Sequence, residues 1–430
     1  MQFNISATDI IILFAYVAGT RLFFGWYITK KYKDATPENY FLAGRKLGWT
    51  IIGFSFYVSN MSGSTFVGLP GSGYKYGIAV YNYEWLPAVI LIFFIAFILP
   101  YFFKSGTYTA PGFLEKRFDK RSKITFSVFL LFANIFIDAA AALYAGGMIF
   151  KVIFPDVQLW LIILLLSLTA GIYIYFGGLD AVVLNDALQA IMIFLGGILI
   201  TYFAWQKIPS WDALTSSIPE KSLHLIQSVN DDFLPWPGIF SGVLIIGIYF
   251  WCTNQFIIQR ALAARDLNEG RRGALFAGFL KLPNLFILII PGLIALYLYP
   301  DIERADMVFP ALAFNLLPEG LKGLMLAALA AAILSSLESI YNSASTLFTM
   351  DIIANFRSAA KDKYLVKTGR ISTIAFMILS AAWAPQIERF PTLWEYLQSI
   401  LSYITPPIAA LFIMAVFWKK LLRQQRFIPC

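Results

Sequence analysis

Cysteine and histidine are almost missing from this sequence of 430 residues. It has two cysteines, Cys252 within a predicted helix and Cys430 at the last position. They provide no disulfide framework and no metal-binding spacing. The one histidine, His224, lies in a predicted loop. A redox or zinc-dependent function therefore has almost no residues to build on.

Charge is also scarce. Only 13% of the residues are charged and 59% are hydrophobic, whereas typical soluble domains are about a quarter charged. Apolar runs of about 20 residues, each long enough to cross the hydrocarbon core of a bilayer, recur along the whole chain. We therefore expect an all-α polytopic membrane protein whose main partner is the lipid bilayer.

The apolar runs predict about eleven transmembrane helices. They cover 8–28, 49–69, 83–103, 123–150, 158–176, 184–206, 237–259, 273–299, 321–355, 370–386 and 393–418. The first run has no basic residues before it, and basic residues follow it, so we interpret it as a retained helix rather than a cleaved signal.

The loops between these helices alternate in charge. One set holds 24 of the Lys and Arg residues and the other holds 7. The rich set is 29–48, 104–123, 260–272, 357–370 and 419–426. By the positive-inside rule it is cytoplasmic, which predicts an outside N-terminus, a cytoplasmic tail over 419–430 and a place in the plasma membrane. The net charge of +8 is thus topological and does not indicate nucleic-acid binding.

The helices after the first divide into two sets of five. An odd number per set places 49–206 and 237–418 in opposite orientations. The first helix of each set carries polar residues at membrane depth, in 59–73 and 249–259. Paired broken helices in two inverted halves indicate a binding site at the midplane of a secondary transporter. The alternative is that Gly and Ser merely ease helix packing.

A run of hydroxyls marks the helix predicted at 321–355. Ala332, Ser335, Ser336, Ser339 and Ser343 share one helix face by their spacing. Hydroxyls, together with backbone carbonyls freed at a helix break, are suitable ligands for Na+. Packing is the alternative, because Ser in membrane helices also bonds to its own preceding turn. Opposite a broken helix, we favour the ion site.

We single out four of the charged residues that fall within or at the ends of the predicted helices. Intramembrane charges are rare and indicate function by default. Asp186 and Glu338 are the two strongest candidates, although Asp186 is also explained by a place at the cytoplasmic helix end. Snorkelling to the surface is the alternative for Lys281. An interfacial position is the alternative for Glu84, which otherwise suits the hydroxyls of a sugar.

Several stretches together resemble the sodium/solute symporter family, and most closely its sodium/sugar cotransporter branch. They are "SNMSGSTFVGLPGSGYKYGIAVYNYEW" (59–85), "YTAPGFLEKRFDK" (108–120), "FGGLDAVVLNDALQ" (176–189), "YFWCTNQFIIQRALAA" (249–264), "FLKLPNLFILIIPG" (279–292) and "AAILSSLESIYNSASTLFTMDI" (331–352). The resemblance implies an inverted five-plus-five fold with one extra N-terminal helix. It also implies Na+-driven uptake of a solute by alternating access.

The resemblance further implies cation sites. The main sodium site would use carbonyls and hydroxyls of Val58, Met61, Ala332, Ser335 and Ser336. A second cation site, found in some members, would use Asp186 and Ser339. Those members usually have a hydroxyl where this chain has Glu338. We hypothesise that this carboxylate strengthens a second cation site or carries a titrating proton.

The implied solute site matches the family in part. Binding side chains would be Thr65, Glu84, Lys281, Gln398, Trp251 and Phe250, and gate residues Leu69, Tyr83 and Trp394. The chain has Gly247, Pro87 and Thr65 where the family often has other polar residues, and Phe250 where an inner-gate tyrosine is usual. These differences leave the solute open between a sugar, a polyol such as inositol and a sugar acid such as sialic acid.

Members of the branch usually continue for several further helices, whereas this chain ends at "FWKKLLRQQRFIPC". A non-transporting truncated relative is therefore an alternative to a symporter. A channel would need a continuous polar stripe, and a sensor would need a tethered signalling domain. A membrane-embedded enzyme would need a nucleophile–base or metal set, so we expect no enzyme. No obligate protein partner is inferred.

Overall fold

The computed structural model describes residues 5–31, 36–357, 361–389 and 393–418. Within these ranges the chain is helical, with two isolated backbone bridges and no strand, which confirms the all-α class. The helices are α1 Ala7–Lys31, α2 Pro37–Leu42, α3 Trp49–Asn60, α4 Gly63–Tyr76, α5 Asn82–Phe93, α6 Leu99–Ser105, α7 Ala110–Arg117, α8 Lys120–Phe132, α9 Ala140–Ile153, α10 Leu159–Trp205, α11 Trp211–Ser217, α12 Trp236–Gly238, α13 Leu244–Thr253, α14 Gln255–Leu262, α15 Leu267–Lys281, α16 Ile290–Leu298, α17 Val308–Leu316, α18 Leu321–Thr346, α19 Ala354–Phe356, α20 Asp362–Trp383 and α21 Leu393–Phe417.

Many of these helices are long and apolar enough to cross a membrane. Seven helical stretches meet that criterion among the described residues, and two shorter apolar helices accompany them. Some stretches join two helices through π-helical turns, as at Phe94–Ile98 and Ala133–Ala139. The protein is therefore a multi-pass membrane protein, while the count of eleven spans stays a prediction.

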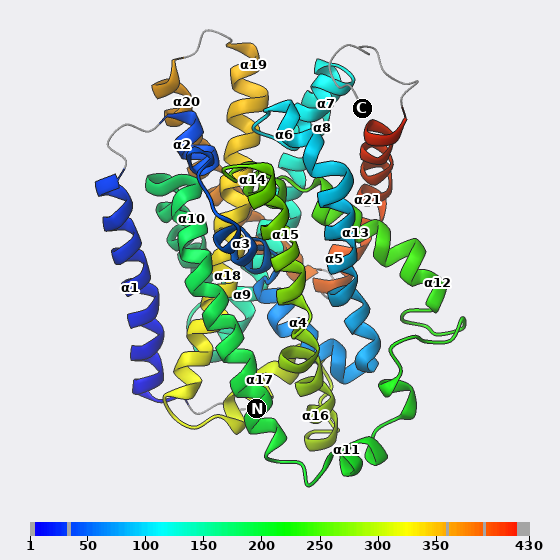
Figure 1. Cartoon of the computed structure of the whole chain (residues 1–430). Coiled ribbons are helices and arrows are strands. Elements are labelled where there is room, and N and C mark those ends of the chain that lie inside the picture. The colour runs from blue at the N-terminus through cyan, green and yellow to red at the C-terminus, as the bar shows by residue number, and fades with distance from the viewer. Residues whose placement is uncertain (1–4, 32–35, 358–360, 390–392, 419–430) are drawn as a thin grey trace.

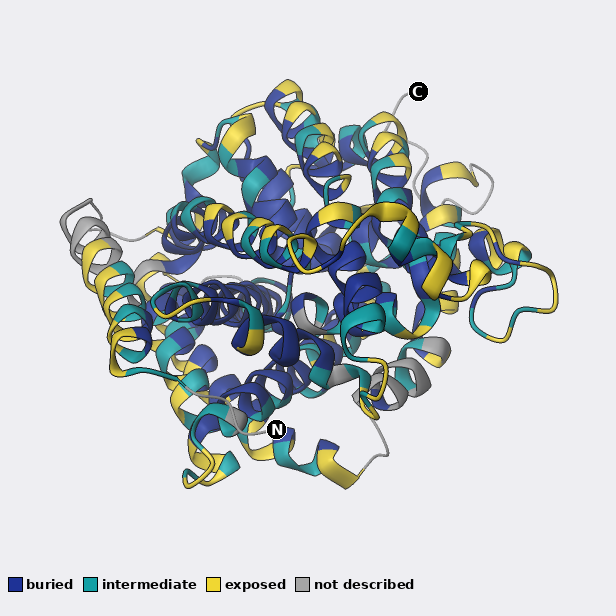
Figure 2. Cartoon of the chain, turned by 90° about the horizontal axis from the view of Figure 1, so that it is seen from below, coloured by how far each residue is buried: buried dark blue, intermediate teal, exposed yellow. Residues whose placement is uncertain are grey.

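Large apolar side chains lie on the outside of the bundle. Leu22, Phe240 and Phe279 are 64–73% exposed, as lipid-facing side chains would be. Viewed along the bundle, buried residues fill the centre and exposed residues form the rim (Figure 2). Polar residues buried at that centre are therefore shielded from both lipid and water.

The connections fall at two opposite ends of the bundle (Figure 1). Short helices α2 and α7 lie at one end with the C-terminal end of α21, and α11, α16 and α17 lie towards the other. The structure thus adds short helices, such as α17, within segments that the sequence analysis expected to be loops. α2, α7 and α11 each begin with a capping side chain, which hydropathy does not detect; Thr36, for example, caps α2 before Pro37.

Two helices are interrupted, as expected. Between α3 and α4, Met61 has a non-helical ψ of 70°, and the Ser62 hydroxyl then accepts from the Thr65 N–H to start α4. Between α13 and α14, Asn254 has a ψ of 128° and caps the new helix. Both breaks fall inside the stretches 59–73 and 249–259, which confirms their predicted positions.

The two helices expected at 158–176 and 184–206 are both present within α10, as Leu159–Tyr175 and Gly178–Trp205, and a sharp kink separates them. The kink lies at Gly178, which has a positive φ of 57°. A Cβ there would come within 2.3 Å of the Tyr40 carbonyl oxygen. Only glycine fits that left-handed position and close approach, so Gly178 sets the boundary between the two helices.

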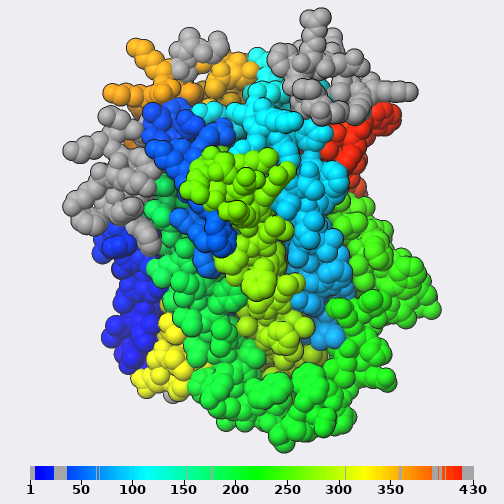
Figure 3. Space-filling view, in the orientation of Figure 1, coloured from blue at the N-terminus to red at the C-terminus, as the bar shows by residue number. Residues whose placement is uncertain are grey.

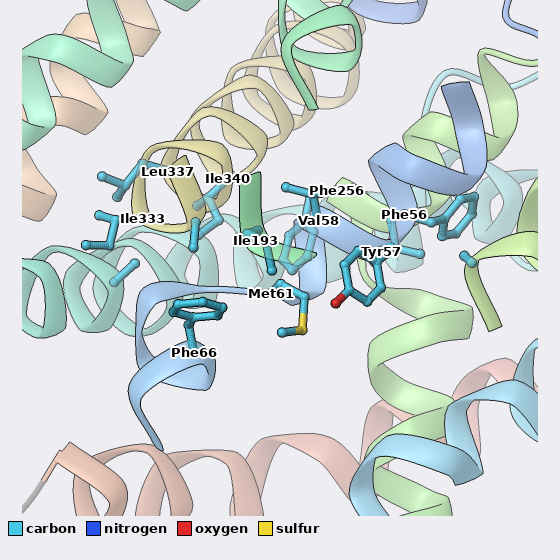
Figure 4. Packing of buried hydrophobic residues seen from close by; sticks show 14 of the residues in the cluster. Phe56, Tyr57, Val58, Met61, Phe66, Ile193, Phe256, Ile333, Leu337 and Ile340 are labelled. Atoms are coloured by element: carbon cyan, nitrogen blue, oxygen red, sulfur yellow. The ribbon is translucent and has the colours of Figure 1, made fainter. Parts of the chain in front are cut away.

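α18 lies at the centre of the bundle. In its stretch Leu321–Phe356, 94% of the most apolar window is buried, and it packs against α1, α4 and α10. Gly63, the first residue of α4, lies so close to α18 that a Cβ would meet Ile333 at 2.3 Å. This approach places the start of α4 directly beside α18, and Figure 4 draws Met61 and Phe66 together with Ile333 of α18 in this packed region.

Candidate ion and solute sites

The α3–α4 break faces the expected sodium ligands on α18. The Ser59 hydroxyl lies 3.4 Å from that of Ser339, and Gly63 packs on Ile333. These two contacts bracket Ser335 and Ser336 on α18. The expected ligands Val58, Met61, Ala332, Ser335 and Ser336 are all buried, none of them more than 2% exposed.

The serines of this face hold carbonyl and carboxylate oxygens together. The Ser336 hydroxyl donates to the Ala332 carbonyl at 3.1 Å, and Ser335 donates to Asp186 Oδ1 at 2.8 Å. A hydroxyl that donates its proton still offers lone pairs. The arrangement therefore brings hard oxygen atoms together in a buried place, and oxygen ligands of this kind suit hard cations such as Na+.

Asp186 lies in the protein interior and is paired with an arginine that the sequence analysis assigned to a loop. Its Oδ2 atom accepts from Arg260 Nη2 at 3.2 Å and from the Ser55 hydroxyl. Arg260 Nη2 also donates to the Ser339 hydroxyl. Asp186 is 0% exposed, so a position at the helix end, the alternative raised above, does not account for it.

Glu338 is paired with the N-terminal helix. Arg21 of α1 forms an ion pair with its Oε1 atom, and Asn185 Nδ2 donates to Oε2 at 3.4 Å. The Arg21 guanidinium also lies over the Tyr173 ring, 4.5 Å from its centroid. Glu338 is 0% exposed and Arg21 is 14% exposed at its side chain, so the pair is shielded from bulk solvent.

A second polar cluster surrounds Glu84 and Lys281. Lys281 Nζ lies 2.8 Å from Glu84 Oε2, and Asn284 Nδ2 donates to the same oxygen at 2.6 Å. Asn284 Oδ1 in turn accepts from the Tyr57 hydroxyl at 2.9 Å. Lys281 is 1% exposed and also donates to Asn60 Oδ1. Both the snorkelling and the interfacial alternatives are therefore wrong for these residues.

Aromatic rings border this cluster. Lys281 Nζ lies 5.7 Å from the centroid of the Trp251 ring, and Phe56 stacks on the same ring at 6.5 Å. Phe250 contacts Trp251 edge-on at 5.3 Å. An apolar ring face beside hydroxyl-binding groups is the combination that a sugar needs.

Three of the remaining expected solute-site and gate residues are placed by the structure. Thr65 lies in the first turn of α4, where its hydroxyl bonds to the Asn60 carbonyl at 3.3 Å. Leu69 is buried, and Tyr83 packs on Phe233 with ring centroids 6.4 Å apart. The side chains of two expected residues lie outside the described part of the structure. They are Trp394 and Gln398.

Several residues of these clusters were not predicted, and four of them make the main charged or amide contacts. They are Arg21, Asn60, Arg260 and Asn284. A signal existed for Arg21, because it is a charge inside the predicted span 8–28. Asn60 was visible as an amide within the broken stretch. Nothing in the sequence distinguishes Arg260 from neighbouring loop arginines, since it follows directly after the predicted helix 237–259.

Paired broken helices around buried polar clusters are the arrangement found in secondary transporters that are built from inverted repeats. Its sequence matches the model of the sodium:solute symporter family over residues 40–427. The chain therefore belongs to that family, as the resemblance implied. The family consists of transporters rather than enzymes, which agrees with the expectation of no enzymatic activity.

Named relatives are similar over most of the chain. A sodium/glucose cotransporter of Vibrio parahaemolyticus is 35% identical over 98% of this chain and 82% of its own length. Sodium/myo-inositol cotransporter 2 of Bos taurus is 36% identical over 97% and 67%. Sodium/glucose cotransporter 1 of Oryctolagus cuniculus is 34% identical over 90% of this chain, which spans 64% of that protein.

A solved structure shares the fold. It is the substrate-bound outward-open state of a Na+-coupled sialic acid symporter, with a TM-score of 0.86. The match covers 97% of this chain and 88% of that one at 24% sequence identity. At that identity the likeness supports the architecture alone.

Proposed function

We propose that this protein is a Na+-coupled secondary active symporter that imports a sugar or sugar-like solute by alternating access. One observation carries the proposal: of two consecutive residues at the α3–α4 break, Ser59 contacts the ion-side cluster and Asn60 contacts the solute-side cluster. The Ser59 hydroxyl lies 3.4 Å from Ser339 on the ion side, while Asn60 accepts from Lys281 on the solute side. A change at the break on binding one ligand is thereby transmitted to the other.

The proposed mechanism is thermodynamic linkage. Na+ binds among Val58, Met61, Ala332, Ser335 and Ser336 and fixes the α3–α4 break against α18. This favours the outward-open state, in which the solute meets Glu84 and Lys281. The solute then closes the outer gate of Leu69, Tyr83 and Trp394. Each ligand raises the affinity for the other, since both favour the same conformations.

A neutral solute suits the cluster better than an acid. The Lys281 ammonium is already compensated by Glu84 at 2.8 Å, so no uncompensated positive charge is left for a carboxylate. Glu84 and the Asn60 and Asn284 amides offer acceptors and donors for hydroxyls, with Trp251 beside them. We rank a neutral sugar first, a polyol such as inositol second and a sugar acid such as sialic acid third.

The orientation in the membrane is part of the proposal. The excess of Lys and Arg in one set of loops supports a cytoplasmic location for that set, with the N-terminus outside and the tail inside. Uptake from outside then places the protein in the plasma membrane.

Uptake into proteoliposomes tests the proposal. The wild type and Ser336→Ala are supplied with labelled glucose, galactose, myo-inositol and sialic acid, with and without an inward Na+ gradient. We expect Na+-dependent accumulation of one solute by the wild type and at least a tenfold loss in Ser336→Ala, the effect of about 1.4 kcal/mol. Ser345→Ala is the matched control, because Ser345 lies on the same helix but bonds to Gly369 at 2.8 Å.

Three outcomes separate the alternatives. Uptake that saturates and requires Na+ excludes a channel. Flat uptake for every solute, in protein that still binds Na+, indicates a different solute class. Flat uptake without Na+ binding supports a non-transporting relative and overturns the proposal.

A further inference from the structure

α1 is attached to α18 at two points. Asp9 Oδ1, in the first turn of α1, accepts from the N–H groups of Gly320 at 2.8 Å and Gly323 at 2.7 Å, which begin α18. Further along, Arg21 meets Glu338. The helices thus run side by side from one end of the bundle to its middle, with α1 at the edge (Figures 1 and 3).

Arg21 and Glu338 depend on each other. Glu338 has no exposed surface, and its other described polar partner is the neutral amide of Asn185, at 3.4 Å. A buried carboxylate without a cation is strongly unfavourable. Glu338 must therefore be either compensated by a cation or protonated, and in this protein the guanidinium of α1 lies against it as a compensating cation.

The pair lies next to the expected second cation site. Asn185 and Asp186 are consecutive on α10, and Glu338 and Ser339 are consecutive on α18. Ser339 and Asp186 both contact Arg260. Asp186 and Glu338 are each matched by a guanidinium group, which leaves neither carboxylate with an uncompensated negative charge for a further cation. A second Na+ would make the buried region positive, at an electrostatic cost that low dielectric increases.

We infer that Arg21 is a built-in cation that takes the place of a second transported Na+, so that the symporter carries one Na+ per solute and α1 forms part of its ion-binding machinery. This inference rests on the proposed function. It makes Arg21 a residue that determines stoichiometry. Replacing it by a neutral side chain would leave Glu338 uncompensated and turn its surroundings into a site that attracts Na+.

Counting bound sodium tests the inference without any solute. Radioactive Na+ binding to the purified full chain is measured at pH 8.5 and saturating Na+, for the wild type, Arg21→Met, Arg21→Lys and the double variant R21M/E338Q. We expect one bound Na+ for the wild type, two for Arg21→Met, and one for the double variant, which lacks both charges. Arg21→Lys keeps the positive charge and is expected to bind one.

The outcomes are distinct. Two Na+ bound by the wild type, or the same number bound by Arg21→Met and wild type, would overturn the inference. No Na+ bound by the wild type would overturn the proposed function itself. If Arg21→Met does not fold, two measurements on the wild type still test the inference: the number of Na+ ions bound and the charge moved per solute transported. Two Na+ ions per solute would contradict the inference, and one Na+ ion per solute would support it.

Discussion

The ion side and the solute side of this protein both bury acid–base pairs, but they use different bases. On the ion side, Asp186 and Glu338 are matched by arginines. On the solute side, Glu84 is matched by Lys281, and amides complete the cluster. A guanidinium is permanently charged and holds several donors in a rigid fork, whereas an ammonium on a flexible stem reorients its three donors.

This difference gives the two kinds of base different roles: the arginines fix helices relative to one another, and the lysine exchanges its hydrogen-bond partners. Arg260 joins α14 to α10, α3 and α18 through Asp186, Ser55 and Ser339, so its bonds fix helices relative to one another. Lys281 bonds to side chains at a helix break and beside an aromatic ring. Solute hydroxyls can replace such partners one at a time. We therefore expect the ion side to govern stability and the solute side to govern affinity.

The largest effect is expected from breaking the arginine network. Asp186→Asn removes the charge that compensates Arg260, whose side chain is 1% exposed. Loss of one partner of a buried ion pair costs about 3–5 kcal/mol. We expect a large drop in the thermal unfolding temperature in detergent micelles, together with loss of uptake.

An ion pair with an exposed arginine provides the control for Asp186→Asn. Arg265 is 62% exposed and pairs with Glu269 at 2.8 Å. Arg265→Ala is expected to change stability by less than about 1 kcal/mol, because solvent screens such pairs. Equal effects of the two substitutions would contradict a structural role for the Asp186–Arg260 pair.

On the solute side, Glu84→Gln is expected to lower stability less than Asp186→Asn does, but to weaken solute affinity strongly. Glu84→Gln keeps the shape and leaves Lys281 without its carboxylate. Loss of a hydrogen bond to a charged group costs about 1.5–3 kcal/mol, so the KM for solute should rise about 10- to 100-fold, with little change in Na+ half-saturation. Initial uptake rates over a range of solute and Na+ concentrations measure both constants.

Glu115→Gln is the matched control, since Glu115 also pairs with a lysine, Lys123, at 2.8 Å, but outside the solute cluster. It should leave the KM unchanged. If Glu84→Gln instead raised the Na+ half-saturation and left the solute KM alone, the division between the two sides would be wrong.

Much of the framework could be predicted from the sequence, because it depends on local patterns. Apolar runs predict helices, and polar residues at membrane depth predicted both breaks. The hydroxyl-rich face of α18 is a periodic pattern that needs no tertiary information. Gly178 shows the limit of such patterns, since the boundary between the two helices of α10 depends on one left-handed glycine and on its close approach to Tyr40.

The pairings could not be predicted, because they join residues far apart in the chain. Arg21 and Glu338 come from the first and the central helix, and their contact depends on how those helices pack. Arg260 was counted as a loop residue because hydropathy ends the helix just before it. In the structure α14 continues inside the bundle, and the same residue is fully buried.

The smallest effect is expected at Thr65, which lies between the two sides and sharpens the comparison. Its hydroxyl bonds back to the Asn60 carbonyl at 3.3 Å and to the Ser62 hydroxyl at 3.0 Å, so it supports the break itself. Losing such a bond costs about 0.5–1.5 kcal/mol. Thr65→Val should therefore raise the half-saturation constants for Na+ and solute together, each about two- to threefold. Thr169→Val, which loses a comparable bond to Leu165, should change neither. A rise in the solute constant alone would assign Thr65 to solute binding, because only a residue that supports the break affects both ligands.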